Sequence, residues 1–149
     1  MQITVNANDI NHGMGLVTRA LSARPTRSVY EGVFAKTVEG GVQLTCTDGV
    51  MTIRTIVNAI VAQEGNALLP AKLLSELLRK LEGDITIRVE DHARATVTAN
   101  GSRTNMLCMD TSEFPDIQDV SAEYVTTIPQ NKLRDAVNRI IFAASSDEN

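Results

Sequence analysis

The sequence repeats a pattern of one strand followed by one helix, and this repetition restricts the possible folds more than any other feature. The pattern begins near Thr4, Leu68 and Thr127. Leu73 in the second copy lies 63 positions after Ile10 in the first, and both fall on the apolar face of a helical pattern. A repeat of this kind predicts one supersecondary unit that recurs along the chain.

A strand pattern recurs at almost the same spacing. The segment Leu44-Thr45-Cys46-Thr47-Asp48 resembles Met106-Leu107-Cys108-Met109-Asp110, which lies 62 positions later. The 149 residues also amount to about one ordinary domain. The expected boundaries are 1–121 for an N-terminal domain, with repeat units of about 1–63 and 64–121, and 122–149 for the start of a second domain.

The first unit is predicted to contain a strand, a helix and three further strands. Asp9 is a suitable N-cap residue for the helix. The apolar face that follows consists of Ile10, Met14, Val17 and Leu21. Arg24-Pro25 is expected to end the helix, because the residue before a proline avoids the helical conformation. The strands expected in this unit are 2–6, 29–38, 42–48 and 51–61.

The second unit has the same order of elements. Its helix is expected over 71–80, and Gly83 follows at a position where glycine commonly ends a helix. The apolar stripe of this helix consists of Leu73, Leu74, Leu77, Leu78 and Leu81. The strands expected in this unit are 84–90, 94–99 and 103–109. Because polar and apolar residues alternate along these strands, we expect antiparallel sheets and an α+β fold.

The third copy is short. A strand is expected at 124–128 and a helix at 130–144, and the helix carries an apolar stripe that must be covered by another surface. The stripe consists of Leu133, Val137, Ile140 and Ile141. We therefore expect the sequence to be part of a longer chain. The acidic segment Asp110–Glu123, which contains Pro115, is expected to link two domains.

Positive charge is concentrated in the helical segments, although the formal net charge is −4. The segments 9–27, 71–80 and 131–144 hold nine of the 14 basic residues and three of the 18 acidic ones. If the helices share one surface, that surface attracts a polyanion while the remainder repels it. The charges could also simply solvate helix faces. The repeat favours the first interpretation, since repeated units point their helices the same way.

Patterns typical of enzymes are missing from the sequence. No P-loop, GxSxG, GxGxxG, HExxH or CxxC pattern occurs, and the only histidines are His12 and His92. Cys46 and Cys108 alternate with polar residues, as small core residues do. Asp48 and Asp110 could in principle be a general acid and base, but turn formation explains them better. We expect no enzyme activity, cofactor or metal.

Other features suggest a cytoplasmic location. The N-terminus lacks the basic and apolar regions of a signal peptide, and no apolar run is long enough to span a membrane. Two cysteines do not make a disulfide framework, which fits a reducing compartment.

Short motifs along the whole chain resemble the bacterial DNA polymerase III beta subunit family, the replication sliding clamps. They are Leu21-Ser22-Ala23-Arg24-Pro25-Thr26, Tyr30-Glu31-Gly32-Val33, Leu44-Thr45-Cys46-Thr47-Asp48, Leu69-Pro70-Ala71-Lys72, Glu113-Phe114-Pro115-Asp116 and Phe142-Ala143-Ala144-Ser145-Ser146-Asp147-Glu148-Asn149. Ser28 departs from the pattern, since many members have a proline there. The order and spacing of the motifs make the resemblance specific.

The resemblance implies a clamp fold, with antiparallel sheets outside and helices on the inner face. It also implies a three-domain chain that forms a head-to-tail homodimeric ring around duplex DNA, without sequence preference, and tethers the polymerase. The family's binding pocket for polymerase and clamp loader is expected in domains beyond these residues.

The resemblance also implies two sets of site residues. The DNA-binding set is Arg24, Lys72, Arg79, Lys80 and Arg139. The dimer-interface set is Arg94, Arg103, Thr104 and Met106, on or near an edge strand over 103–109. An unpaired edge strand invites a partner strand. Met106 could equally be an ordinary core residue.

Two other functions remain open from the sequence. The same repeat could build a stand-alone protein-binding module or a clamp regulator, which would be a stable monomer. An enzyme of unknown type would require a cleft with strongly perturbed titratable groups.

Overall fold

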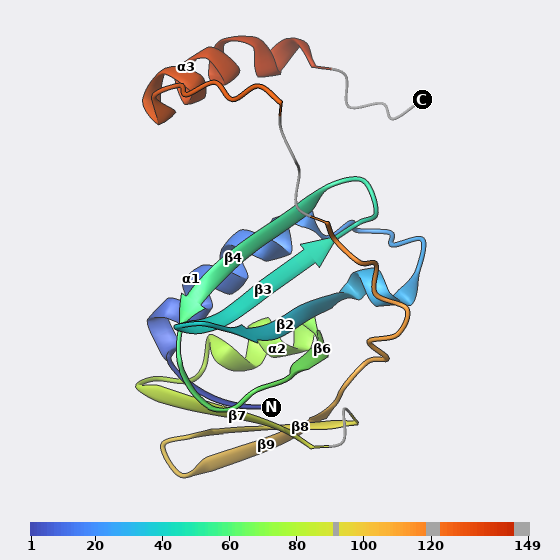
Figure 1. Cartoon of the computed structure of the whole chain (residues 1–149), viewed down its shortest axis with the longest axis vertical. Helices are drawn as coiled ribbons and strands as arrows, with labels where there is room; N and C mark the ends of the chain where they lie inside the picture. Colours follow the sequence, from blue (N-terminus) through green and yellow to red (C-terminus); the bar gives the residue numbers. More distant parts are fainter. Residues whose placement is uncertain (91–92, 119–122, 145–149) are drawn as a thin grey trace. The chain divides into compact units, whose positions relative to one another are not determined.

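The strands of the N-terminal part of the chain form two antiparallel sheets (Figure 1). The computed structural model describes residues 1–90, 93–118 and 123–144, in two units, Met1–Pro115 and Asp116–Asn149. The five-stranded sheet has the order β5 (Ile60–Gln63), β1 (Gln2–Asn6), β7 (Asp84–Glu90), β8 (Arg94–Ala99) and β9 (Ser102–Leu107). The four-stranded sheet has the order β4 (Thr52–Asn58), β3 (Gly41–Thr47), β2 (Gly32–Val38) and β6 (Asn66–Pro70).

The two repeat units exchange their first strands. Strand β1 pairs along its length with β7 of the second unit, from Gln2 opposite Arg88 to Asn6 opposite Asp84. Strand β6 in turn pairs with β2 of the first unit. The predicted order of strand, helix and strands is therefore confirmed, but each sheet contains strands from both units. Neither sheet is therefore complete within one unit.

The strand predicted over 51–61 is two strands. The strand is interrupted at Ala59: β4 ends before it in the four-stranded sheet, and β5 begins after it in the five-stranded sheet. The Ala59 amide donates to the Gly40 carbonyl at 3.4 Å, and this bond holds the residue between the two strands against the β2–β3 hairpin. Apolar residues continue on both sides of this point, with Ile56 and Val57 before it and Ile60 and Val61 after it, so the sequence pattern alone did not reveal the change of sheet.

Helix α1 (Ala7–Val17) begins directly after β1. Its N-cap residue is Asn6, whose side chain accepts a hydrogen bond from the Asn8 amide at 2.9 Å, and not Asp9 as predicted. A short 3₁₀ helix, η1 (Thr18–Ala20), continues α1, and Leu21 is already extended. The helical segment thus ends before Arg24-Pro25 is reached.

Helix α2 (Ala71–Leu78) occupies the corresponding place in the second unit. Leu74 and Leu78 are fully buried, as its predicted stripe requires, whereas Leu73 is 51% exposed. The helix ends at Leu78 with Arg79 as its C-cap residue, earlier than the predicted end at 80, and Gly83 lies in the loop before β7. Gly83 has a positive φ of 74°, and its carbonyl accepts from the Ala7 amide at 2.8 Å. Burying a leucine stabilises a fold by roughly 1.5–3 kcal/mol, so the inner side of α2 contributes strongly to folding.

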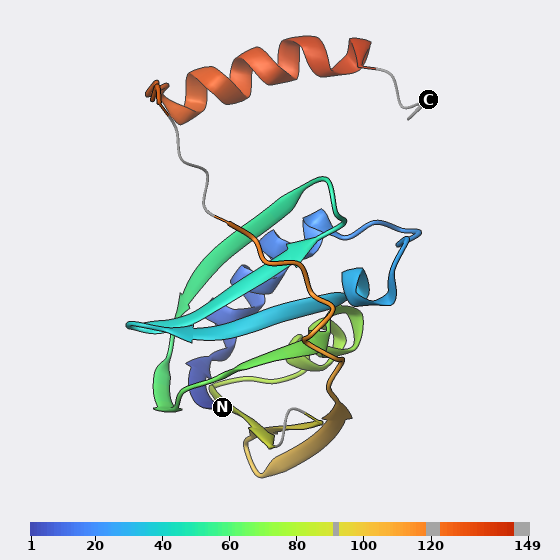
Figure 2. The same cartoon turned by 45° about the vertical axis from the view of Figure 1, so that its right-hand side comes forward.

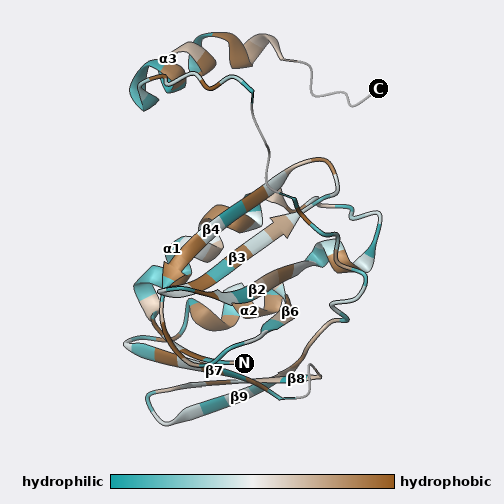
Figure 3. Ribbon diagram, viewed as in Figure 1, coloured by the Kyte–Doolittle hydropathy of each residue, from teal (hydrophilic) through white to brown (hydrophobic). Residues whose placement is uncertain are grey.

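Both sheets and both helices share one hydrophobic core. Its largest fully buried side chains include Ile3, Ile10, Met14, Leu44, Leu69, Leu74, Leu78, Ile85 and Ile87. Figure 3 shows both hydrophobic and hydrophilic residues along β4, in which Val57 is buried in the core and Ile56 is 59% exposed. Figures 1 and 2 both show α1 and α2 behind the four-stranded sheet.

Residues 109–115 cross the other face of the four-stranded sheet (Figures 1 and 2). Met109 pairs with Leu68, and the Phe114 ring stacks on Phe34 with centroids 5.0 Å apart. The predicted linker Asp110–Glu123 therefore begins as a docked part of the first unit, which extends to Pro115.

The second unit contains helix α3 (Gln130–Ile140) and the short 3₁₀ helix η3 (Ile141–Ala143). The strand predicted at 124–128 is wrong, because described residues 123–129 form no strand. A strand needs a neighbour to satisfy its backbone groups, and the described part of this unit contains no other strand. The predicted boundary at 121–122 and the end of the last motif, 145–149, lie outside the described residues.

Candidate nucleic-acid interface

Helices α1 and α2 lie side by side and expose neighbouring faces. The side-chain amide of Asn11 on α1 donates to the carbonyl of Leu78 at the end of α2 at 3.1 Å, and to the Ala7 carbonyl at 2.8 Å. This half-buried amide holds the end of α2 against α1. We use the term helix side for the exposed residues of α1, η1 and α2, together with the loop 21–27.

Positive charge on the helix side comes from α2, η1 and the loop, and not from α1. Helix α1 contains no Lys or Arg, and its exposed residues are Asn8, Asp9, His12 and Gly15. Exposed basic residues of the helix side are Arg19, Arg24, Arg27, Lys72, Arg79 and Lys80. Segment 9–27 is therefore basic, as predicted, but its three arginines all follow α1 and none lies within it.

Arg24 occupies the exposed loop that follows η1. Its backbone amide donates to the Ser22 hydroxyl at 3.1 Å, which shapes the turn before Pro25. Proline restricts its own φ and the conformation of the residue before it. The loop thus presents the Arg24 side chain to solvent from a backbone with limited freedom.

Lys72 and the pair Arg79 and Lys80 lie at opposite ends of α2. Lys72 is exposed in the first turn, and the amides of Arg79 and Lys80 close the last turn on Ser75 and Leu77. Eight residues at about 1.5 Å each place the two ends roughly 12 Å apart. Glu76 is exposed between them. Cations at a helix C-terminus also stabilise the helix, so part of the pattern serves folding.

Arg139 lies on α3 in the second unit and is exposed. The four other predicted DNA-binding residues belong to the first unit. The structure therefore places Lys72 in α2, Arg79 and Lys80 directly after it and Arg24 in the loop after η1, and it describes Arg139 separately. A shared surface with Arg139 stays a prediction.

Strand β9 forms one edge of the five-stranded sheet, as the edge-strand prediction requires. The four predicted interface residues, however, do not share one face. Arg94 and Arg103 are exposed on the outer face, whereas Met106 is only 5% exposed and belongs to the core. Side chains alternate along a strand, so Thr104 shares the inner face with Met106. Met106 is thus buried within the chain, as its interpretation as a core residue expects, and contact of these four residues with a partner stays a prediction.

A hollow of about 200 Å³ lies between α2 and β9. It is lined by Leu73, Glu76, Leu77, Lys80, Thr104, Asn105 and Met106. Leu73 was assigned to the core stripe by its spacing, yet it is half exposed at this hollow. The leucine pairs in the pattern were the available signal, because adjacent residues such as Leu73 and Leu74 differ by about 100° around a helix and do not both face the core squarely.

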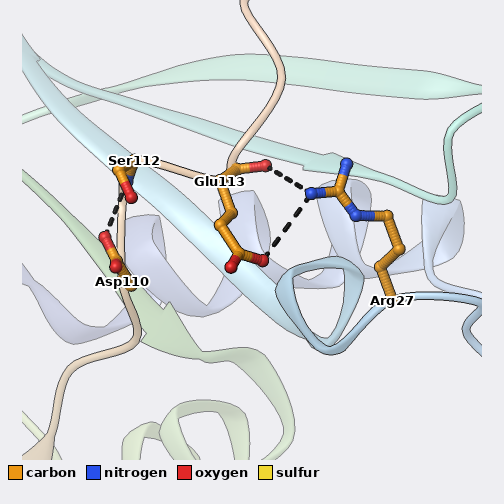
Figure 4. Close-up of polar contacts among 4 residues, drawn as sticks. All are labelled: Arg27, Asp110, Ser112 and Glu113. Carbon is orange, nitrogen blue, oxygen red and sulfur yellow. Dashed lines mark hydrogen bonds and ion pairs between the residues drawn. The ribbon is translucent and has the colours of Figure 1, made fainter.

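Asp48 and Asp110 form turns, as expected. Asp48 Oδ1 accepts from the amides of Met51 at 2.7 Å and Val50 at 2.9 Å, and these bonds hold the pKa of its carboxyl below the ordinary value. Asp110 accepts from the Ser112 amide at 2.8 Å (Figure 4), which likewise lowers its pKa. Each carboxylate therefore stabilises the turn in which it lies.

The two cysteines have the environment of structural thiols. Burial raises the pKa of Cys46 to about 12 and also raises that of half-buried Cys108. Within residues 1–90, 93–118 and 123–144, no three His, Cys, Asp or Glu side chains are grouped so as to hold a metal ion. The acidic turn with His92 is outside the described residues. In the same ranges, no helix has the length and apolar character needed to cross a membrane.

Comparison with known proteins places this geometry in a family. Residues 1–118 match the model of the DNA polymerase III beta subunit, N-terminal domain. A "Beta sliding clamp" of Synechocystis sp. is 31% identical over 99% of the chain, and one of Halalkalibacterium halodurans is 31% identical over 94%. The chain covers only 40% and 38% of these relatives.

Solved structures share the fold. A putative DNA polymerase III beta subunit from Eubacterium rectale matches all of the chain with a TM-score of 0.93 at 22% identity, and the chain covers 41% of it. The DNA polymerase sliding clamp of Bacillus subtilis gives the same TM-score and identity, with 42% of that protein covered. The predicted α+β clamp fold is thus confirmed.

Proposed function

The chain belongs to the family of the DNA polymerase III beta subunit, N-terminal domain, and from this premise we propose that it serves as part of a sliding clamp that holds duplex DNA along its helix side. The clamp acts by encircling DNA and is not an enzyme. Sequence-independent contact suits this role, because phosphates attract basic side chains equally at every position along the duplex.

The separation of charge supports this proposal most directly. Lys72 is exposed on α2, Arg79 and Lys80 are exposed directly after its last residue, and Arg24 is exposed in the loop 21–27. The sheet side, by contrast, exposes many of the carboxylates, among them Glu39, Glu64, Glu90 and Asp84. A protein with net charge −4 can therefore attract duplex DNA on one side only.

We place the contact between copies at the edge strand β9. Its outer backbone groups can pair with a strand of a second clamp subunit, and the hollow beside Leu73 and Leu77 can receive an apolar side chain. Arg94 and Arg103 at the exposed rim suit acidic residues on that partner. In the complete clamp, two such contacts close a head-to-tail ring.

The second unit is the start of a further clamp domain in this proposal. Leu133 and Ile140 are 51% and 67% exposed on α3, so its apolar face suits burial within such a domain. Arg139 then adds to the basic surface that faces DNA. Polymerase and clamp loader bind to parts of the clamp beyond these residues.

The test is the salt dependence of duplex DNA binding by the 149-residue chain. Neutralising Lys72 and Arg79 with glutamine should flatten the slope of log K against log salt by up to ~1.8, since each phosphate contact contributes about 0.9. The matched control is Lys36→Gln with Arg88→Gln, which removes one Lys and one Arg from the outer faces of the sheets. Equal losses in the two double variants would refute a DNA site on the helix side.

A further inference from the structure

Arg27 belongs to the basic loop, but its guanidinium is engaged by residues far away in the sequence. Its Nη2 lies 3.6 Å from Glu113 Oε2 and donates to the Glu113 backbone carbonyl at 3.4 Å (Figure 4). The guanidinium carbon also lies 5.8 Å from the centre of the Tyr30 ring. Glu113 therefore offsets the charge of Arg27, which distinguishes this residue from Arg24 three positions earlier.

The segment that carries Glu113 is itself fixed to the sheet. The Met109 amide donates to the Leu68 carbonyl at 2.8 Å, and the Phe114 ring stacks on Phe34 at an interplanar angle of 11°. Leu68 is fully buried. Glu113 thus stands between two anchored positions, and the guanidinium of Arg27 meets a defined carboxylate.

A tight turn orients the Glu113 side chain between these anchors. Asp110 accepts from the Ser112 amide at 2.8 Å, and the Phe114 amide donates to the Thr111 carbonyl at 3.2 Å. These bonds restrict the backbone on both sides of Glu113, and the first of them is drawn in Figure 4. The segment therefore holds the carbonyl and carboxylate oxygens of Glu113 in place to accept hydrogen bonds from a basic side chain.

Arg27 is equally well connected on its own side. Its carbonyl accepts from the Tyr30 amide at 3.1 Å, and the Tyr30 ring packs close to Gly49 at the turn between β3 and β4. Arg24 sits between this fixed end and η1, on a loop that passes around the end of the four-stranded sheet (Figures 1 and 2). Fixing Arg27 consequently shortens the free part of the loop.

We propose that Arg27 is a positioning residue: with Glu113 it latches the loop 21–27 to the segment 109–115 and so determines where Arg24 is held. This inference rests on the proposed function, because it assigns the latch to a DNA-facing arginine. It also removes Arg27 from the set of residues available to phosphate.

The exposure of the pair determines what the latch can do. The side chains of Arg27 and Glu113 are 49% and 60% exposed, and ion pairs with this exposure add little to global stability. Their loss should loosen the loop without unfolding the domain. The measurement must therefore report local order.

The test compares Glu113→Arg with Glu39→Arg in the 149-residue chain. Both substitutions change the net charge by the same amount, but Glu39 is exposed in the turn that follows β2, whereas the loop 21–27 precedes β2. In the wild type and in Glu39→Arg, the amide order parameter of Arg24 should stay near that of a rigid backbone, about 0.8. In Glu113→Arg it should fall below about 0.6, and the reversed pair Arg27→Glu with Glu113→Arg should restore order.

An unchanged order parameter in Glu113→Arg, or a reversed pair as mobile as that single variant, would overturn the latch. Duplex DNA binding separates this result from the proposed function. If order responds as predicted while no variant binds DNA, the latch stands and the function fails. If DNA binding depends on the helix side while order never responds, the function stands and the latch fails.

Discussion

The two halves of the repeat place equivalent elements differently against the core. Helix α1 packs by close backbone approach, since a Cβ at Gly13 would lie 2.5 Å from Val57 Cγ2. Helix α2 packs through leucines and carries the basic residues on its exposed side. The repeat thus preserves the positions of the elements, while packing and charge have diverged. The fold requires both helices, but the proposed DNA contact depends on one of them.

The largest effect is expected within α2. Leu74 is buried to 1% exposure, so Leu74→Ala should lower the free energy of unfolding by about 2–5 kcal/mol. Leu73→Ala is the matched control, because that side chain is half exposed and should cost less than about 1 kcal/mol. Urea unfolding followed by circular dichroism measures both. Similar losses would mean that α2 does not pack as described.

Smaller changes in stability, of opposite sign, are expected for two glycine substitutions in α1. Gly13→Ala forces Val57 to shift, and overpacking of this kind costs roughly 1–3 kcal/mol, partly offset by the better helix propensity of alanine. Gly15→Ala meets no atom within 4 Å and should stabilise the chain by about 0.5–1 kcal/mol. Thermal unfolding measures whether each variant melts above or below the wild type. A shift in the same direction for both variants would contradict the close approach of α1 to β4.

The smallest effect compares Asp48 and Asp110, which occupy equivalent places in the two halves. Their folded pKa values are lowered from 3.8 by backbone hydrogen bonds, so the stabilisation they provide is present above that pH and is lost as pH falls through the lowered values. The variants Asp48→Asn and Asp110→Asn should therefore lose less stability between pH 5 and pH 2 than the wild type. Urea midpoints across this range give the measurement. If a variant loses as much stability at low pH as the wild type, the replaced aspartate does not stabilise its turn through these hydrogen bonds.

Sequence patterns predicted most elements because those elements depend on local periodicity. Alternation identified β7 and β8 with their bounds, and the leucine spacing identified α2. The exchange of β1 and β6 between sheets was not predictable in this way, since pairing depends on contacts far apart in the chain. The docking of 109–115 was missed because acidic residues and Pro115 are typical of linkers, while Phe114 and Met109 make the contacts.

The site was predictable in part. The family resemblance implied Lys72, Arg79 and Lys80, and the structure shows all three to be exposed, while their contact with DNA stays a prediction. Leu73 was expected in the core and is half exposed, because spacing along a helix does not say which neighbour covers each face. For Met106 the sequence left both an interface and a core position open, and the structure shows it buried. The role of Arg27 depends on Glu113, 86 positions away, and no pattern in the sequence joins them.

The central claim is that the chain forms part of a clamp that is linked to DNA by topology. The most direct measurement loads the full-length clamp onto a nicked circular duplex with its loader and records retention before and after the circle is cut. We predict retention on the circle and escape from the linear form, because a ring can slide off free ends. Equal retention on both forms would contradict the account, since it would mean that direct affinity, and not encirclement, holds the protein on DNA.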